Sequence, residues 1–194
     1  MTRIAIVVGT TRPGRRGALV AHWVRETAQQ HRPEVTFDVV DLHDYNLPHL
    51  DEAAPAIFGT YENPSTQRWA DTVGSYNGFI FVAPEYNHSF PGVLKDAIDF
   101  LFGEWADKAA GFVTYGVQAG GVRAAEHLRL VLAEVKVATV RTQVGLSLHH
   151  DFDLTDPLDP GTLTPGEHQQ RALTTMVDEV SAWSAALKSL RVPA

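Results

Sequence analysis

Short runs of apolar residues alternate along the chain with longer segments in which apolar residues recur every third or fourth position. Runs that are apolar throughout are typical of parallel strands buried on both faces, and the longer spacing is typical of amphipathic helices. The pattern predicts strands at residues 3–8, 35–42, 78–83, 110–115 and 139–146. It predicts helices at residues 18–30, 66–76, 91–102, 121–134 and 166–190.

The regular alternation of strands and helices predicts an α/β protein with a parallel sheet between two layers of helices. The simplest arrangement is a doubly wound, three-layer α/β/α sandwich whose five strands follow the order 2-1-3-4-5. The length fits a single domain over residues 1–194. Residues 43–65 and the acidic, proline-rich residues 149–166 are predicted to be loops. Because ligands of such folds bind beyond the carboxyl ends of the strands, we expect the site in the loops after the first, third and fourth strands.

Composition narrows the class of protein. An apolar content of 44% and a charged content of 20% are typical of soluble globular proteins. The net charge of −7 argues against a nucleic-acid partner. The chain has no cysteine, which excludes disulfides, thiolate nucleophiles and cysteine metal ligands. It starts with a strand pattern instead of a signal peptide, and no apolar run approaches the roughly 20 residues that span a bilayer. We therefore expect a cytoplasmic protein without membrane insertion.

A glycine- and arginine-rich segment, GTTRPGRRG at residues 9–17, follows the first predicted strand. Its outer glycines fit a P-loop, but Arg15 and Arg16 stand where that motif needs a lysine and a hydroxyl residue. The spacing of its three glycines also differs from the G-x-G-x-x-G of dinucleotide sites. Hydroxyls, arginines and a helix N-terminus remain, and this combination suits one phosphate group. The alternative is a glycine-rich turn whose arginines are solvated.

Two further loops carry polar groups at the same edge of the predicted sheet. The third strand ends in APEYNHSFPG at residues 83–92, where two prolines stiffen a backbone that can contact the edge of a heteroaromatic ring. An ordinary connection of this kind needs only about 2–6 residues. The fourth strand ends in YGVQAGG at residues 115–121, whose glycines allow a ligand to approach the backbone closely. Taken alone, these glycines also fit a simple turn.

Together, the segments GTTRPGRRG, FVAPEYNHSFPGVLKDAIDFL and YGVQAGGVRAAEHLRLVL resemble the NADPH-dependent FMN reductase family, a flavodoxin-like group that includes quinone, azo-dye and chromate reductases. The most specific part is PEYN followed by P-x-x-L-K-x-A-I-D. The resemblance implies a flavodoxin-like fold, bound FMN, and NADPH or NADH as hydride donor. The expected activity passes hydride from NAD(P)H through FMN to a flavin, quinone, azo or nitro acceptor by a ping-pong mechanism. Because the flavin carries this chemistry, no catalytic side chain and no metal are expected.

The resemblance also implies which residues hold the cofactor. Thr10 and Arg12 would bind the FMN phosphate, and the backbone from Arg15 through Gly17 and Ala18 to Leu19 would complete the cradle. The isoalloxazine ring would be bordered by Pro84, Glu85, Tyr86 and Asn87. Its other edge would lie against Tyr115, Gly116, Gly120 and Gly121. Many relatives carry serine or asparagine within the cradle, where this chain has Arg15, Arg16 and Gly17.

A homodimer or homotetramer is a further expectation from the resemblance. The helices after the third and fourth strands could supply an apolar contact face through Phe100, Leu101, Leu128 and Val131. In a monomer these residues would be ordinary core. Trp105 and Lys108 could also lie near a subunit contact, and core packing accounts equally well for Trp105.

Other polar clusters have simpler interpretations. His149, His150 and Asp151 begin an acidic segment that lacks the glycine and final glutamate of a calcium loop, so a solvated loop is favoured over a metal site. Lys95 and Asp99 are four residues apart and predict an ion pair within one helix. The alternative to a reductase is a flavodoxin-like electron carrier without NAD(P)H activity, although the first loop lacks a flavodoxin-like Thr-Gly-Asn-Thr segment.

Overall fold

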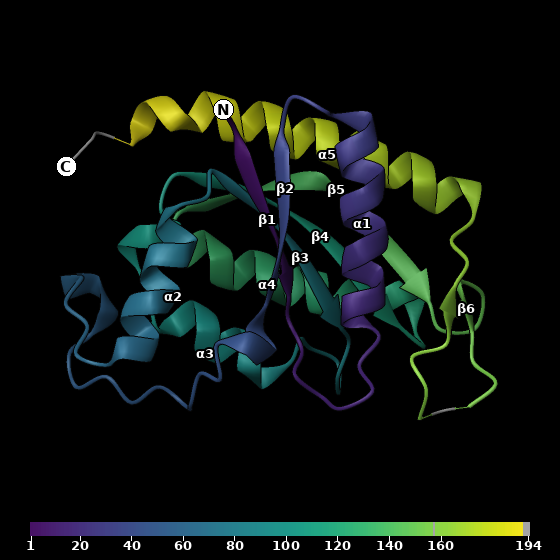
Figure 1. Ribbon diagram of the computed structural model, residues 1–194, viewed down its shortest axis with the longest axis horizontal. Helices are drawn as coiled ribbons and strands as arrows, with labels where there is room; N and C mark the ends of the chain where they lie inside the picture. The colour runs from purple at the N-terminus through teal and green to yellow at the C-terminus, as the bar shows by residue number, and fades with distance from the viewer. Residues whose placement is uncertain (157, 192–194) are drawn as a thin grey trace.

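Five parallel strands form the central sheet of the protein (Figure 1). A computed structural model describes residues 1–156 and 158–191 of the chain. The strands are β1 (Arg3–Val8), β2 (Thr36–Asp41), β3 (Gly78–Pro84), β4 (Lys108–Gly116) and β5 (Val137–Ser147). Their order in the sheet is β2-β1-β3-β4-β5, which confirms the predicted flavodoxin-like topology.

Helices cover both faces of this sheet, so the molecule has three layers (Figure 1). The α-helices are α1 (Gly17–His31), α2 (Pro64–Gly74), α3 (Gly92–Asp99), α4 (Val122–Glu134) and α5 (Glu167–Leu187). α1 and α5 pack on one face, and α2, α3 and α4 pack on the other. Short 3-10 turns lie at Leu42–Asp44, Ala56–Phe58, Gly103–Trp105, Ala119–Gly121 and Lys188–Leu190.

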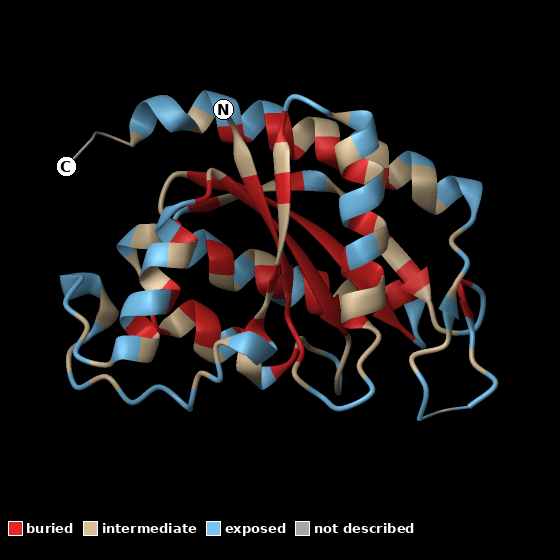
Figure 2. Ribbon diagram, in the orientation of Figure 1, coloured by how far each residue is buried: buried red, intermediate tan, exposed pale blue. Residues whose placement is uncertain are grey.

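The core lies in two apolar layers, one on each face of the sheet. In β1, Ile4 and Ile6 pack towards α1 and α5, whereas Ala5 and Val7 pack towards α2, α3 and α4. This alternation follows from the two-residue period of a strand. Figure 2 shows the central strands buried along most of their length, with exposed residues on the outer sides of the helices. Continuous apolar runs are therefore required in these strands because both faces are covered.

The register of the strands brings the three candidate loops together. Val8 at the end of β1 is paired with Asp41 of β2 and with Val82 of β3. Pro84 at the end of β3 is in turn paired with Tyr115 of β4. The segments that follow β1, β3 and β4 therefore leave the sheet side by side at its carboxyl edge.

The acidic segment after β5 differs from the prediction. Residues 149–166 were expected to be a loop, but they contain a short antiparallel hairpin of β6 (Phe152–Asp153) and β7 (Thr162–Leu163). Two-residue strands carry no detectable periodicity, so the pattern of apolar residues does not reveal them. Asp151 is buried rather than solvated, and its carboxylate accepts the N–H of Ser147 at 2.7 Å.

The predicted apolar face for a second subunit is largely wrong, because most of its residues belong to the core. Phe100, Leu101 and Leu128 are at most 1% exposed and pack between the sheet and α2, α3 and α4. Only Val131 of that set is partly exposed. Trp105 is also fully buried in this layer, as the core interpretation required. The predicted ion pair between Lys95 and Asp99 is confirmed at 2.6 Å.

Both ends of the described chain lie on the side of the amino edge of the sheet, away from the candidate site (Figure 1), and both contact Asn77. The side-chain oxygen of Asn77 accepts the N–H of Arg3 at 2.9 Å. Its carbonyl oxygen accepts a hydrogen bond from Nη1 of Arg191 at 3.3 Å. Among the described residues, no helix is both long enough and apolar enough to cross a membrane.

Candidate functional site

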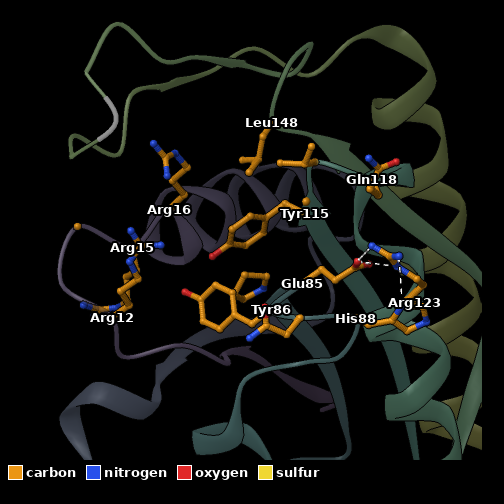
Figure 3. Close-up of a pocket in the computed structure, with 15 residues that line it drawn as sticks. Arg12, Arg15, Arg16, Glu85, Tyr86, His88, Tyr115, Gln118, Arg123 and Leu148 are labelled. Atoms are coloured by element: carbon orange, nitrogen blue, oxygen red, sulfur yellow. Dashed lines mark hydrogen bonds and ion pairs between the residues drawn. The ribbon is translucent and has the colours of Figure 1, made fainter.

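A cleft of about 240 Å³ opens at the carboxyl edge of the sheet, where the loops after β1, β3 and β4 converge (Figure 3). Eight of the residues predicted to hold the cofactor line it: Arg12, Arg15, Pro84, Glu85, Tyr86, Asn87, Tyr115 and Gly116. The folded chain thus brings these eight predicted residues together around one cleft. The role of each residue in binding stays a prediction.

The wall formed by the loop after β1 ends at an uncapped helix N-terminus. Arg16 occupies the N-cap position of α1, and no side chain there bonds to the backbone of the first turn. The first turn also contains no acidic residue. The first N–H groups of an α-helix have no partner inside the helix and carry a partial positive charge. The N–H groups at Gly17, Ala18 and Leu19 are thus suited to an anion.

The three arginines of this loop have different environments. Arg15 forms an ion pair with Asp41 at the end of β2, and both side chains are less than one-fifth exposed. Arg16 donates through Nη2 to the backbone carbonyl of Asp159 at 3.0 Å. Arg12 is exposed. Its carbonyl accepts the N–H of Arg15 at 3.1 Å, but its guanidinium has no hydrogen-bond or ion-pair partner within residues 1–156 and 158–191. Arg12 is therefore the guanidinium of this loop that an anion can engage without breaking an existing contact.

Thr10 lies beneath this loop and not at the surface of the cleft. It is 1% exposed, and its Oγ1 is 3.2 Å from the phenolic oxygen of Tyr86. Gly17 is also buried. A larger residue would not fit there, since a Cβ would come within 3.0 Å of side-chain atoms of Thr10 and Val8. The glycine thus lets α1 start directly against β1, which brings its N-terminus to the cleft.

The loop after β3 forms a tight turn held by its own backbone. Tyr86 donates its N–H to the carbonyl of Ser89 at 2.8 Å, and Ser89 donates back to Tyr86 at 3.0 Å. The two residues between them, Asn87 and His88, have φ values of 48° and 77°. Two consecutive positive φ values are the signature of a type I′ turn. The N–H of Glu85 donates to the carbonyl of Tyr115 at 2.9 Å and fixes this turn to the end of β4.

Two tyrosine rings lie between the arginine-bearing loop and Glu85, and both hydroxyls point towards the arginines (Figure 3). Tyr115 is 5% exposed, and Tyr86 is partly exposed. Burial, and after it the neighbouring phenol of Tyr86, raises the pKa of Tyr115 above its ordinary value. The Tyr115 hydroxyl is therefore neutral at physiological pH and can act as a hydrogen-bond donor.

Of the three glycines expected at the ring edge, Gly116 at the end of β4 lies where it was expected, whereas Gly120 and Gly121 do not. Gly116 lines the cleft, and a Cβ there would come within 3.2 Å of Cβ of Glu85. Gly120 and Gly121 do not line it; both have positive φ, and a Cβ at Gly120 would lie 2.7 Å from the carbonyl carbon of Gly145 in β5. Gly120 therefore allows the turn before α4 to pack against the sheet and is not placed at the edge of the cleft.

Arg16, expected to contribute its backbone to the cradle, also lines the cleft, and several residues of the wall were not predicted: Gly14, His88, Val117, Gln118, Arg123 and Leu148. Arg123 stands out because its guanidinium contacts both Glu85 and His88 (Figure 3). It is the second residue of α4, so its place just after the loop following β4 was a signal that it would lie near the cleft. Leu148 directly follows β5 and carries no comparable signal.

The chemistry of these groups fits a flavin that carries one phosphate. Arg12 and the uncapped N-terminus of α1 supply positive charge at one end. Pro84, Tyr86 and Tyr115 offer apolar and aromatic surface at the other end. The turn at Tyr86–Ser89 has backbone groups close to that surface. Such a mixture of apolar surface with a few directed polar groups is typical of cofactor sites.

Comparison with known proteins decides the family. A model of the family described as NADPH-dependent FMN reductase matches residues 2–151. The chain belongs to this family. The activity expected from the sequence, an FMN-dependent oxidoreductase that uses NAD(P)H, is that of the family.

Relatives agree with this membership, and a solved structure shares the fold. An NAD(P)H-dependent FMN reductase, ntnL of Nectria sp, is 34% identical over 181 residues, which cover 89% of this chain and 87% of the relative. A 2-hydroxy-1,4-benzoquinone reductase of Burkholderia sp is 29% identical, with 93% and 95% covered. The flavoenzyme FerB, an NAD(P)H:(acceptor) oxidoreductase of Paracoccus denitrificans, has the same fold, with a TM-score of 0.71, 22% identity, and 96% and 98% of the two chains covered.

Proposed function

We propose that this protein holds FMN in the cleft and reduces a small-molecule acceptor with electrons from NAD(P)H in a ping-pong cycle. The observation that carries the proposal is the free guanidinium of Arg12 beside the uncapped N-terminus of α1. An anion held there lies next to the platform formed by the turn after β3. When bound, FMN would supply the two-electron chemistry, accepting hydride from the nicotinamide and passing it to the acceptor.

In this proposal, the residues of the cleft bind the FMN and orient its ring. Arg12 and the N–H groups of Gly17, Ala18 and Leu19 hold the phosphate, with the hydroxyl of Thr10 behind them. Pro84, Glu85, Tyr86 and Asn87 border the ring on one side, and Tyr115 and Gly116 border it on the other. The side chains supply no nucleophile and no metal ligand to the reaction, and one face of the ring is left to the donor and the acceptor in turn.

The proposed acceptor is a flat, conjugated molecule. Relatives are named as a 2-hydroxy-1,4-benzoquinone reductase and an FMN-dependent NADPH-azoreductase. A shared stacking site accepts flavins, quinones, azo or nitro compounds because stacking selects for flatness more than for functional groups. Either NADPH or NADH can serve as donor in this proposal, and a cytoplasmic location accompanies it.

Steady-state kinetics test this function. The purified protein with FMN and a quinone should consume NADPH, measured as loss of its near-ultraviolet absorbance. Double-reciprocal plots at several quinone concentrations should give parallel lines, as a ping-pong cycle requires. Intersecting lines would contradict the ping-pong step, and a rate equal to that without protein would favour the electron-carrier alternative.

We also propose a homodimer, with a contact face different from the one first expected. Leu130 of α4 is 75% exposed, and it lies in a shallow groove lined by Ser89, Phe90, Lys95, His127, Leu130 and Val131. This groove adjoins the turn after β3, so a second copy seated on it would also wall the cleft. Leu130→Asp should halve the mass measured by light scattering, whereas Leu190→Asp, a matched change at a residue 57% exposed elsewhere, should not. A wild-type mass near 21.3 kDa would contradict the dimer.

A further inference from the structure

The turn that borders the proposed ring site is held in an unfavourable backbone conformation. Asn87 and His88 occupy the two central positions of a type I′ turn, with φ of 48° and 77°. Asparagine adopts positive φ readily, but the second central position strongly favours glycine. A histidine there needs support from the surrounding structure to keep the turn closed.

That support comes from the first turn of α4 (Figure 3). Nε of Arg123 donates to Oε1 of Glu85 at 2.7 Å, and Nη2 of Arg123 donates to the same oxygen. Nη1 of Arg123 lies 3.2 Å from Nδ1 of His88. One guanidinium therefore contacts residues on both sides of Tyr86 and Asn87. One helical turn further along α4, Nδ1 of His127 lies 3.0 Å from Oγ of Ser89.

The burial of the Glu85 side chain stabilises its ion pair with Arg123. It is 5% exposed, whereas the Arg123 side chain is 37% exposed. Its Oε2 is buried without a hydrogen-bond partner in the described part of the chain. A buried carboxylate needs a paired cation, so Glu85 and Arg123 are expected to stay together. Gly116 also leaves no spare room beside Glu85, because a Cβ at position 116 would come within 3.2 Å of Cβ of Glu85.

Arg123 is not needed to hold α4 itself. Ala124, Ala125, Leu128 and Leu132 of this helix are fully buried against the sheet. A second arginine of the helix, Arg129, donates to the carbonyl of Val140 at 2.7 Å and so ties α4 to β5. The guanidinium of Arg123 instead reaches away from the core, to the turn.

We propose that Arg123 is a positioning residue of the FMN site: through Glu85 and His88 it holds the Tyr86–Ser89 turn closed, so that the backbone of Tyr86 and Asn87 is fixed for the ring. This inference rests on the proposed function, because it concerns the same cleft. It assigns Arg123 to the ring end of the cofactor and not to the phosphate end. Its loss should therefore weaken flavins with and without a phosphate by the same factor.

Arg123→Lys is the decisive variant, because lysine keeps the charge beside Glu85 but cannot contact Glu85 and His88 together in the fork geometry of arginine. We expect amide hydrogen exchange at Tyr86 and Ser89, measured by NMR without flavin, to become roughly tenfold faster, as for the loss of one ordinary hydrogen bond. The dissociation constants of riboflavin and FMN, from calorimetric titration, should rise together by a similar factor, so that their ratio stays constant.

A rescue and a matched control make the test specific. His88→Gly removes the backbone strain, so in the Arg123→Lys background it should restore slow exchange and most of the affinity for both flavins. Arg129→Lys makes the same chemical change on the same helix. It should lower the thermal midpoint without changing exchange in the turn or the affinity for riboflavin.

Three results would overturn the proposal. Unchanged exchange at Tyr86 and Ser89 in Arg123→Lys would mean that Arg123 does not hold the turn. Weaker FMN binding with unchanged riboflavin binding would place Arg123 at the phosphate. A loss that His88→Gly does not reverse would indicate a general structural role. The failure of the proposed function is separate, because a wild-type protein that binds neither flavin would contradict that function while the exchange measurements still test the turn.

Discussion

The phenolic oxygen of Tyr86 lies 3.2 Å from the hydroxyl of Thr10, and this contact joins the loop after β3 to the loop after β1. The first of these loops borders the proposed ring site, and the second borders the proposed phosphate site. A hydroxyl can accept one hydrogen bond while it donates another. Because Thr10 is buried, a second hydrogen bond from this pair to a ligand would be made by Tyr86, which lines the cleft.

Tyr86→Phe should therefore lower the affinity for FMN while keeping an aromatic ring in the cleft. We expect roughly a three- to tenfold loss, in line with a neutral hydrogen bond of about 0.5–1.5 kcal/mol. Thr10→Val should give a similar loss, and the double variant should lose little more than either one, because the two hydroxyls act together. Calorimetric titration of the three variants checks this, and strictly additive losses would show that the hydroxyls act independently.

Replacement of Arg12 tests the phosphate end of the site. Arg12→Ala should weaken FMN by about 10- to 100-fold, because a hydrogen bond to a charged group contributes roughly 1.5–3 kcal/mol. Riboflavin has no phosphate, so its affinity should not change. Arg25→Ala is the matched control, because Arg25 is also an exposed arginine but lies further along the chain, on α1. Equal losses for the two flavins in Arg12→Ala would mean that Arg12 does not bind the phosphate.

The ion pair between Arg15 and Asp41 predicts a variant that binds more tightly. Asp41 at the end of β2 neutralises a guanidinium that lines the cleft. Asp41→Asn should free this charge, so that FMN binds several-fold more tightly and its affinity falls more steeply with added salt. The affinity for riboflavin, which has no phosphate, should not change. The measurement is FMN affinity at low and high ionic strength, and identical salt dependence in wild type and variant would show that Arg15 is too far from the phosphate to matter.

Lys108 predicts a dependence of stability on pH. Its side chain is buried at the start of β4, and its Nζ donates to the carbonyl of Val73 at 2.7 Å. Burial, and after it the charge of Arg191, lowers the pKa of Lys108 to about 7. Between about pH 7 and the ordinary lysine pKa, the unfolded chain binds the extra proton, so raising the pH stabilises the fold by up to about 1.4 kcal/mol per pH unit.

Urea unfolding at about pH 7 and about pH 9 measures this effect. The free energy of unfolding of the wild type should rise more over this interval than that of Lys108→Met, which has no proton to lose. Below about pH 7 the contribution of Lys108 should no longer change with pH, because both states are protonated. An equal rise in the two proteins would assign the pH dependence to other groups.

The strands of the sheet could be predicted because each is a continuous apolar run between polar segments. The hairpin of β6 and β7 was missed because its strands are too short to show a period. The other failures arose because tertiary packing decides which side chains are buried. Phe100, Leu101 and Leu128 have the helical spacing of a contact face, but the spacing alone does not say whether the sheet or a second subunit covers them. In the sequence, Lys108 resembles a polar residue that precedes a strand. In the structure it is buried as the first residue of β4, because the carbonyls at the end of α2 accept hydrogen bonds from its Nζ.

In the candidate site, too, some features could be predicted from the sequence and others could not. The positions of Arg12, Glu85, Tyr86 and Tyr115 follow from strand order, because each lies at or just after the carboxyl end of a strand. Contacts across the cleft do not follow from it. That Asp41 pairs with Arg15, and Arg123 with Glu85, depends on side-chain directions that only the folded chain sets.

The contacts of Arg3 and Arg191 with Asn77 have a practical consequence for building larger proteins from this one. Both attachment points lie at the amino edge of the sheet, and the mouth of the cleft lies at the carboxyl edge (Figure 1). A second enzyme fused before Arg3 or after Arg191 would leave the mouth unobstructed, and the same holds for a tether to a solid support.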